Sequence, residues 1–286
     1  MAKTGPARKG GDGMRFTKMQ GIGNDFILVD GFDRPVEAPG ALAKRLCDRH
    51  FGVGADGLVL ALPCDGADAR MRIFNSDGSE AEMCGNGIRC LGKLLYDSGQ
   101  CRRSPLRVET AAGTLTLEIE AEGGAARRVT VDMGAPRFEP GRIPVDAPTN
   151  ALTLTAEGRE LAFIAVGMGN PHAVTFDLYP DDETFLRLGP LLERHPAFPR
   201  RANIEFCRPD GRGGVDVRVW ERGDGPTLAC GTGACAVVAA GASRGLLPRT
   251  ATVRLPGGAL QIRWGDDGHL YMTGPAETVF TGEISL

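Results

Sequence analysis

The chain has 286 residues, of which 42% are hydrophobic, and its formal net charge at pH 7 is −3. A chain of this length and apolar content can form two domains with hydrophobic cores, and it is too apolar to be disordered. Because acidic and basic residues are interspersed, we expect no nucleic-acid or membrane partner, and no apolar run approaches the roughly 20 residues that a membrane span needs.

The first half of the chain alternates between strand and helix patterns. Residues 1–13 carry Gly, Lys and Arg without an apolar stretch, which predicts a disordered tail rather than a signal peptide and favours a cytoplasmic protein. From residue 14 onward, strands are expected at 15–19, 26–30, 58–62, 70–74, 106–110, 114–119 and 127–133. Helices are expected at 39–50 and 84–98, because apolar residues recur there at helical spacing.

A stretch rich in Pro and Gly, residues 134–148, is interpreted as the crossing to a second half with the same plan. Strands are expected there at 161–166, 173–176, 203–207 and 215–221, and helices at 181–195 and 231–243. The last of these helices is apolar on nearly all sides, so it must be surrounded by protein. A sheet wrapped around a central helix, once in each half, satisfies both patterns.

We therefore expect an α/β (α+β) fold of two pseudo-symmetric domains, each a mostly antiparallel sheet around a central helix, with the active site in the cleft between them. Residues 14–130 together with 276–286 are assigned to the N-terminal domain. Residues 131–275 are assigned to the C-terminal domain.

Two short segments are near copies of each other, each with a cysteine before a glycine-containing turn. Their cysteines, Cys84 and Cys230, are 230 − 84 = 146 residues apart. The same offset relates Asn24 to Asn170 and Asn75 to Glu221. One register kept across three separate motifs indicates a duplicated scaffold.

Both cysteines stand at expected helix starts, where free backbone N–H groups and the helix dipole stabilise a thiolate and lower the thiol pKa. Two facing halves would place them across one cleft, as a pair of acid–base groups of which one is a thiol and the other a thiolate. The alternative is a pair of buried structural thiols. Among the eight cysteines the spacing is irregular, which favours reduced thiols over disulfides. The irregular spacing also disfavours a structural zinc site. We expect Cys90 and Cys235 to pack in a core.

Common cofactor motifs are weak in this chain. The segment 52–57 matches a dinucleotide fingerprint, but it follows a helix and precedes a strand, the reverse of the order that pyrophosphate binding needs. No lysine follows Lys93, which disfavours a pyridoxal phosphate enzyme because that cofactor needs a Schiff-base lysine. We expect no cofactor and no metal.

Six segments carry a specific resemblance. They are Gly21-Ile22-Gly23-Asn24-Asp25-Phe26, Phe74-Asn75-Ser76-Asp77-Gly78-Ser79, Cys84-Gly85-Asn86-Gly87, Gly169-Asn170-Pro171-His172, Trp220-Glu221-Arg222-Gly223 and Ala229-Cys230-Gly231-Thr232-Gly233. Together, and in this order, they resemble the diaminopimelate epimerase family over nearly everything from residue 14 onward. The cysteine turns alone are shared with proline racemase-like enzymes. Gly57 departs from the glutamine of some family members.

The resemblance implies a cytoplasmic homodimer that interconverts LL- and meso-diaminopimelate without a cofactor, in lysine and peptidoglycan precursor synthesis. It implies that Cys84 and Cys230 are the catalytic thiolate and thiol on opposite faces of the substrate α-carbon. Backbone N–H groups at the two helix starts are suited to the α-carboxylate: Gly85, Asn86, Gly231 and Thr232. Arg222 is expected to hold the distal carboxylate and Glu221 the α-ammonium. Four asparagines are expected to form a polar cup around the distal end: Asn24, Asn75, Asn170 and Asn203.

Other interpretations stay open at this point. Each asparagine is also an ordinary turn former, Glu221 and Arg222 can form a surface ion pair, and His172, expected near the reacting centre, can be a satisfied core histidine. A proline or hydroxyproline racemase is a second enzyme hypothesis, although the proline ring would need apolar residues in the wall of the site. A thiol redox or metal-binding module is the non-enzyme alternative.

Overall fold

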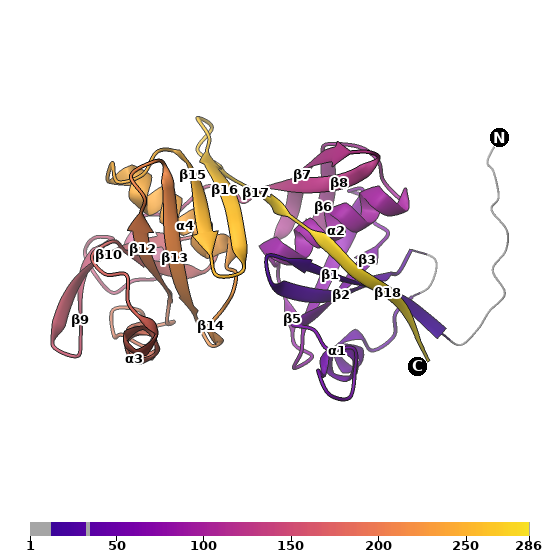
Figure 1. Ribbon diagram of the computed structural model, residues 1–286, viewed down its shortest axis with the longest axis horizontal. Coiled ribbons are helices and arrows are strands. Elements are labelled where there is room, and N and C mark those ends of the chain that lie inside the picture. Colours follow the sequence, from indigo (N-terminus) through magenta and orange to yellow (C-terminus); the bar gives the residue numbers. More distant parts are fainter. Residues whose placement is uncertain (1–12, 33–34, 286) are drawn as a thin grey trace.

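The computed structural model describes residues 13–32 and 35–285. Two lobes lie side by side, and β17 (Leu270–Pro275) lies where they join (Figure 1). The expected tail, residues 1–13, lies outside the described residues apart from Gly13.

The first lobe is a sheet around one helix. Its strands are β1 (Gly13–Gly21), β2 (Asn24–Asp30), β3 (Gly57–Leu62), β4 (Ala69–Asn75), β5 (Glu80–Ala81), β6 (Leu106–Thr110), β7 (Gly113–Glu122) and β8 (Ala125–Asp132). Its helices are α1 (Pro39–Cys47) and α2 (Gly85–Ser98). Pairing is antiparallel except between β2 and β3 and between β4 and β6.

The second lobe repeats this order. Its strands are β9 (Ala151–Ala156), β10 (Arg159–Gly167), β11 (Pro171–Thr175), β12 (Asn203–Pro209), β13 (Gly214–Glu221), β14 (Gly225–Pro226), β15 (Thr250–Leu255), β16 (Gly258–Trp264) and β17. Its helices are α3 (Asp182–Glu193) and α4 (Gly231–Ser243), and a short 3₁₀ helix, η1 (Pro140–Arg142), precedes them. Only β11 with β12 and β13 with β15 pair in parallel, at the positions equivalent to those of the first lobe.

Strands from the two halves also pair with each other. β8 and β17 run antiparallel where the lobes join. The last strand, β18 (Glu277–Ser285), returns to the first lobe and pairs with β1, as Figure 1 shows in yellow. β9 pairs in the same way with β10, the counterpart of β1 in the second lobe. The duplicated plan therefore includes one crossing strand after each half.

The two central helices are both buried, although their sequences differ in character. In α4, residues 233–241 are all buried, as its apolar sequence predicts. α2 is amphipathic, yet its first eight residues are buried because the sheet of the first lobe surrounds that end. The expected α/β (α+β) architecture of two similar halves, each with a central helix, is confirmed.

Two features of the chain differ from expectation. The helix expected to reach residue 50 ends at Cys47, because Asp48 leaves the helical conformation and its Oδ1 accepts hydrogen bonds from the backbone N–H groups of His50 and Phe51. The strand pattern also missed β9 and the four strands between residues 250 and 285.

Candidate active site

The amino ends of α2 and α4 meet at the junction between the lobes. Cys84 and Cys230 are the N-cap residues, each in extended conformation with φ of −139° and −128°. A Cβ added to Gly231 would lie 3.8 Å from the Cα of Gly85, and 2.9 Å from the Sδ of Met272. The distance to Gly85 is an ordinary contact and the distance to Met272 is not, so the two glycines leave room for the Met272 side chain between the helix starts.

A cavity of about 1070 Å³ opens above these helix starts. Most of the residues predicted for the site line it, and they come from both lobes: Asn24, Asn75, Cys84, Gly85, Asn86, Asn170, Glu221, Arg222, Cys230, Gly231 and Thr232. The constant offset along the chain therefore corresponds to two sets of polar groups around one cavity, with one thiol in each set.

Two predicted residues, Asn203 and His172, lie behind the cavity wall instead of on it. Asn203 is 2% exposed; its Nδ2 donates to the Pro171 carbonyl at 3.1 Å, and its Oδ1 accepts from the Arg222 backbone N–H at 2.8 Å. His172 is fully buried, with Nδ1 2.6 Å from Glu205 Oε1. In this structure Asn203 holds Arg222 in place, and His172 supports the wall from within.

Hydrogen bonds connect the buried His172 to Cys230. Nε2 of His172 lies 2.9 Å from Asn170 Oδ1, and Nδ2 of Asn170 donates to Thr232 Oγ1 at 3.4 Å. The Thr232 hydroxyl lies 3.6 Å from Cys230 Sγ. His172 is therefore linked to the thiol through two intervening polar side chains, those of Asn170 and Thr232.

Cys84 has a different environment. Its Sγ lies 3.6 Å from Asn24 Oδ1, which also accepts a hydrogen bond from Asn86 Nδ2 at 3.1 Å. Burial raises the pKa of the Cys84 thiol, while the backbone N–H groups of Gly87 and Asn86 act in the opposite direction.

Burial also raises the pKa of Cys230 well above its ordinary value, and the carboxylates of Glu221 and Glu205 add to the effect. The Gly233 N–H, which donates to Cys230 Sγ at 3.4 Å, is too weak to reverse it. The N–H groups at the helix starts act to lower both thiol pKa values, as expected, but the net shift of each pKa is upward. Desolvation outweighs the N–H groups at both sites, and at Cys230 two carboxylates act in the same direction as burial.

A network of charges behind Asn24 was missed by sequence reasoning. Asp56 accepts from Asn24 Nδ2 at 2.7 Å, and Arg49 bridges Asp56 and Asp25 at 2.7 and 2.8 Å. Lys18, which is 7% exposed, bonds to Asp25 at 2.5 Å. Because a carboxylate only accepts, Asp56 turns the Asn24 oxygen toward Cys84. In the sequence, the one sign of this network was Lys18, a charged residue within the strand predicted at 15–19.

This network should make stability depend on acid pH. Burial acts to raise the pKa of Asp25, but Arg49 and Lys18 overcome it and lower the pKa to about 2. A carboxyl with a lowered folded-state pKa stabilises the fold above its unfolded pKa near 4, and this contribution is lost as the pH falls toward 2. We expect Asp25→Asn to lose about 2 kcal/mol of unfolding free energy at pH 7 and much less at pH 2.5.

Urea unfolding at the two pH values measures this effect. The exposed Asp65 provides the control, because Asp65→Asn removes a carboxyl without removing a buried partner. Equal losses for Asp25→Asn at both pH values would mean that the ion pair does not carry the stability.

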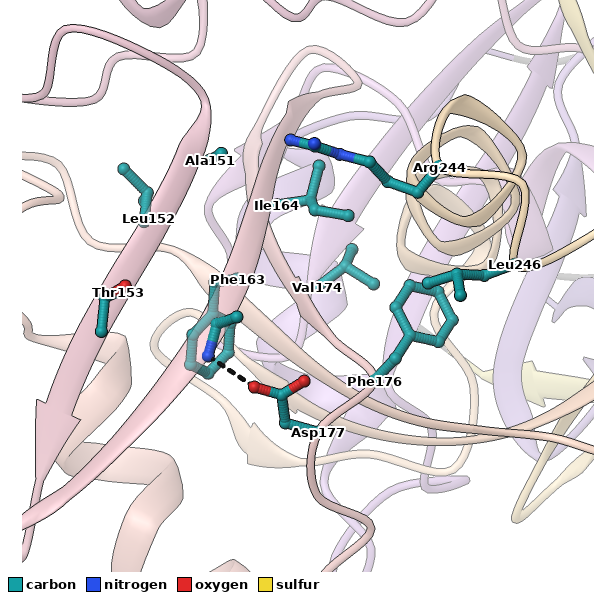
Figure 2. Close-up of a pocket in the computed structure, with 11 residues that line it drawn as sticks. Ala151, Leu152, Thr153, Phe163, Ile164, Val174, Phe176, Asp177, Arg244 and Leu246 are labelled. Atoms are coloured by element: carbon teal, nitrogen blue, oxygen red, sulfur yellow. Dashed lines mark hydrogen bonds between the residues drawn. The ribbon is translucent and has the colours of Figure 1, made fainter.

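A second cavity, of about 390 Å³, lies in the second lobe between β9, β10, β11 and the segment after α4 (Figure 2). Its wall is mostly aliphatic and aromatic, with two charged side chains, Asp177 and Arg244. Asp177 already accepts from the Ala162 backbone N–H at 2.8 Å. With no thiol and no acid–base pair in its wall, this cavity is not where the predicted chemistry would take place.

All eight cysteines are free thiols, and Cys90 and Cys235 are fully buried as expected. Within residues 13–32 and 35–285, no three His, Cys, Asp or Glu side chains are grouped so that they could hold a metal ion. Over the same residues, no helix has the length and apolar character that crossing a membrane would take.

Comparison with known proteins gives one consistent family. A family model described as diaminopimelate epimerase matches residues 16–139 and 164–279. The diaminopimelate epimerase of Methanococcus maripaludis strain S2 is 50% identical over 277 residues, covering 96% of this chain and 100% of that protein. That of Pelotomaculum thermopropionicum is 53% identical over 276 residues, covering 94% and 98%.

Solved structures share the fold at lower identity. A probable proline racemase from Agrobacterium radiobacter K84 superposes with a TM-score of 0.69 at 18% identity, covering 96% of this chain and 93% of that one. A hydroxyproline epimerase from Agrobacterium vitis gives 0.68 at 20% identity with the same coverage. At these identities the likeness establishes the architecture alone.

Proposed function

Because this chain belongs to the diaminopimelate epimerase family, we propose that it inverts one α-carbon of diaminopimelate with Cys84 and Cys230 as the two acid–base groups. The chain is a pyridoxal phosphate-independent diaminopimelate epimerase that interconverts the LL and meso forms, and so an isomerase. The observation that carries the proposed mechanism is the pair of cysteine N-caps, one from each lobe, on the wall of one polar cavity.

Inversion needs a proton to leave one face of the α-carbon and another to arrive on the opposite face. A single base would have to move around the substrate between these steps. Two thiols on opposite walls avoid that movement: the thiolate removes the α-proton while the other thiol delivers its own, and the roles exchange in the reverse direction. Cys84 and Cys230 are the N-caps of two different helices, one in each lobe, which supports this division of roles.

Removal of the α-proton places negative charge on the substrate α-carboxylate. The backbone N–H groups at the starts of α2 and α4 are suited to that charge, because the first turn of a helix leaves them without internal partners. Gly85, Asn86, Gly231 and Thr232 line the cavity at this point. We assign these four residues to the α-carboxylate, which is the group whose charge grows in the transition state.

The other polar groups of the cavity wall suit the rest of the substrate. Glu221 lies beside Cys230, and burial raises the pKa of its carboxyl, an effect that a bound ammonium would offset. We assign Glu221 to the α-ammonium and Arg222 to the distal carboxylate, with Asn24, Asn75 and Asn170 around the distal end. Asn203 acts through the Arg222 backbone, and His172 through Asn170.

Substrate choice is tested by an epimerisation assay on LL-diaminopimelate, with L-proline as the comparison. We expect the meso form to accumulate to equilibrium and proline to keep its optical rotation. The wall around the cysteines offers charged and amide groups where a proline ring would need apolar contacts. Racemisation of proline without any reaction of diaminopimelate would overturn the assignment in favour of the second enzyme hypothesis.

Four further assignments rest on the family and the topology. We place the enzyme in the cytoplasm, in lysine and peptidoglycan precursor synthesis, and we divide it into an N-terminal domain (14–130 with 276–286) and a C-terminal domain (131–275). A homodimer is supported by β18, which pairs among the described strands only with β1 and leaves Val279 and Phe280 57% and 46% exposed. Light scattering should then give twice the 30.3 kDa of one chain.

A further inference from the structure

Arg89 is a buried cation close to the point where the starts of α2 and α4 meet. It lies in the second turn of α2 and its side chain is fully buried. Nη1 donates to the Gly85 carbonyl at 3.2 Å, and Nε donates to the Pro275 carbonyl at 3.2 Å, while Nη2 has no partner. Among the described residues, no carboxylate forms an ion pair with this guanidinium.

The surrounding backbone is shaped around this side chain. A Cβ at Gly21 would lie 2.9 Å from Nη2, and one at Gly274 would lie 3.0 Å from Nε. The sulfur of Met272, the residue that packs against both helix starts, lies 3.7 Å from Nη1. The charge is therefore held in one place, next to the point where the two helix starts meet.

The duplication gives this charge to one lobe only. The residue 146 positions after Arg89 is Cys235, since 235 − 89 = 146, and its side chain is apolar and fully buried. α2 therefore carries a buried cation five residues after its N-cap cysteine, and α4 carries none at the same position. The carboxylate of Glu221 disfavours the thiolate of both cysteines, whereas Glu205 disfavours that of Cys230 and Arg89 favours that of Cys84.

A guanidinium without a counter-ion in a dry interior is strongly unfavourable, so a negative charge nearby is strongly favoured. Three thiols lie within its electrostatic reach: Cys84, Cys90 and Cys235. Burial raises the pKa of both Cys90 and Cys235 to about 12, so these two remain thiols. Cys84 is the only one of the three on the cavity wall, where it also has the Gly87 and Asn86 N–H groups.

We propose that Arg89 is a positioning residue whose fixed charge makes Cys84 the more readily ionised of the two thiols, so that the thiolate of the resting pair forms at Cys84 and Cys230 stays the thiol. The inference rests on the proposed function only in treating the two cysteines as the acid–base pair. It implies that the free enzyme is ready to deprotonate the stereoisomer whose α-hydrogen faces Cys84. The opposite stereoisomer must wait until the proton has moved from Cys230 to Cys84.

Alkylation of the substrate-free enzyme with iodoacetamide, followed over pH and resolved for each cysteine by peptide mass, tests the inference. Iodoacetamide reacts with thiolates, so the midpoint of each pH profile reports ionisation independently of how exposed the sulfur is. In the unmodified enzyme we expect a lower midpoint for Cys84 than for Cys230. A lower midpoint for Cys230 would overturn the proposal without the need for any variant.

Removal of the Arg89 charge should shift the alkylation midpoint of Cys84 and not that of Cys230. Arg89→Met is expected to raise the Cys84 midpoint by about one pH unit, which means about tenfold slower alkylation below it, and to leave the Cys230 midpoint within a few tenths. Arg89→Lys keeps the charge and should restore most of the shift. If Arg89 had only a structural role, its replacement would shift the alkylation midpoints of both cysteines or of neither. Arg89→Lys and Arg89→Met would then have the same effect.

Arg89→Gln is the second neutral variant, because its amide can still donate to the Gly85 carbonyl if the methionine variant folds poorly. A Cys84 midpoint that is unchanged in the folded neutral variant would overturn the proposal. Since no substrate is present, this readout is independent of epimerase turnover. A failed diaminopimelate assay with the expected alkylation profiles would therefore count against the proposed function and not against the role of Arg89.

Discussion

Cys84→Ala and Cys230→Ala should each lower the rate of epimerisation by about 10⁴-fold, the upper end of the contribution of one positioned acid or base. The loss should be this large in both variants because inversion uses both thiols in every turnover. Each substitution removes either the group that takes the proton or the group that returns it. Measurement of meso-diaminopimelate formed from the LL isomer checks the effect.

The remaining thiol gives each variant a residual activity of its own. Cys84→Ala keeps Cys230 and should exchange the α-hydrogen with solvent in one stereoisomer only, and Cys230→Ala should do so in the other. Cys64→Ala is the matched control, since Cys64 is half-buried and outside the cavity wall. If either active-site variant epimerises at more than about a tenth of the normal rate, that cysteine is not one of the two acid–base groups.

The two alanine variants should differ in stability. No hydrogen bond from its own helix caps the Cys84 side chain, and the Gly87 and Asn86 N–H groups only lie close to its sulfur, so its loss should cost the fold less than the loss of Cys230. Cys230 accepts a hydrogen bond from the Gly233 N–H as an N-cap, so Cys230→Ala should lose about 1 kcal/mol. If both variants remain folded under the assay conditions, their loss of turnover reflects the missing thiol and not unfolding.

Arg222→Met should lower kcat/KM by about 10³-fold, because a charged pair to the distal carboxylate contributes several kcal/mol when it is shielded from water. The Arg222 side chain lines the cavity, and its backbone N–H is fixed by Asn203. Arg222→Lys keeps the charge but not the two-pronged geometry, and should recover part of the loss.

A substrate without the distal carboxylate separates this role from a general one. L-Lysine is diaminopimelate without that carboxylate, so any slow α-hydrogen exchange of lysine should be insensitive to Arg222→Met. The exposed Arg212 offers a control with the same substitution outside the cavity. Equal losses on both substrates would place Arg222 in the structure of the site and not on the distal carboxylate.

The sequence predicted the plan of the fold because the duplication is visible in it. The 146-residue offset linked Cys84 to Cys230 before any contact was known, and the apolar helix at 231–243 required a surrounding sheet. Among the strands that were not predicted, β17 and β18 lack a regular alternation of apolar and polar residues and gave little signal, whereas β9 and β15 do alternate.

The electrostatics of the site could not be predicted, because they depend on tertiary burial. A helix start lowers a thiol pKa when water can still reach it, and here desolvation reverses the direction at both cysteines. Motif position likewise placed Asn203 and His172 at the site, but only packing shows that they stand behind its wall. Arg89 gave no signal, since an arginine in an amphipathic helix is usually exposed.

The central claim is that two separate thiols face the two sides of one carbon, and the first turnovers in heavy water test it most directly. A thiolate that removes the α-hydrogen carries that hydrogen as a single proton and returns it to the same isomer, whereas the opposite thiol delivers deuterium from solvent. Starting from LL-diaminopimelate, mass spectrometry should find deuterium in the meso product early, while the recovered LL substrate stays largely unlabelled. Equal early labelling of substrate and product would show one exchanging base serving both faces, and would contradict the two-thiol account.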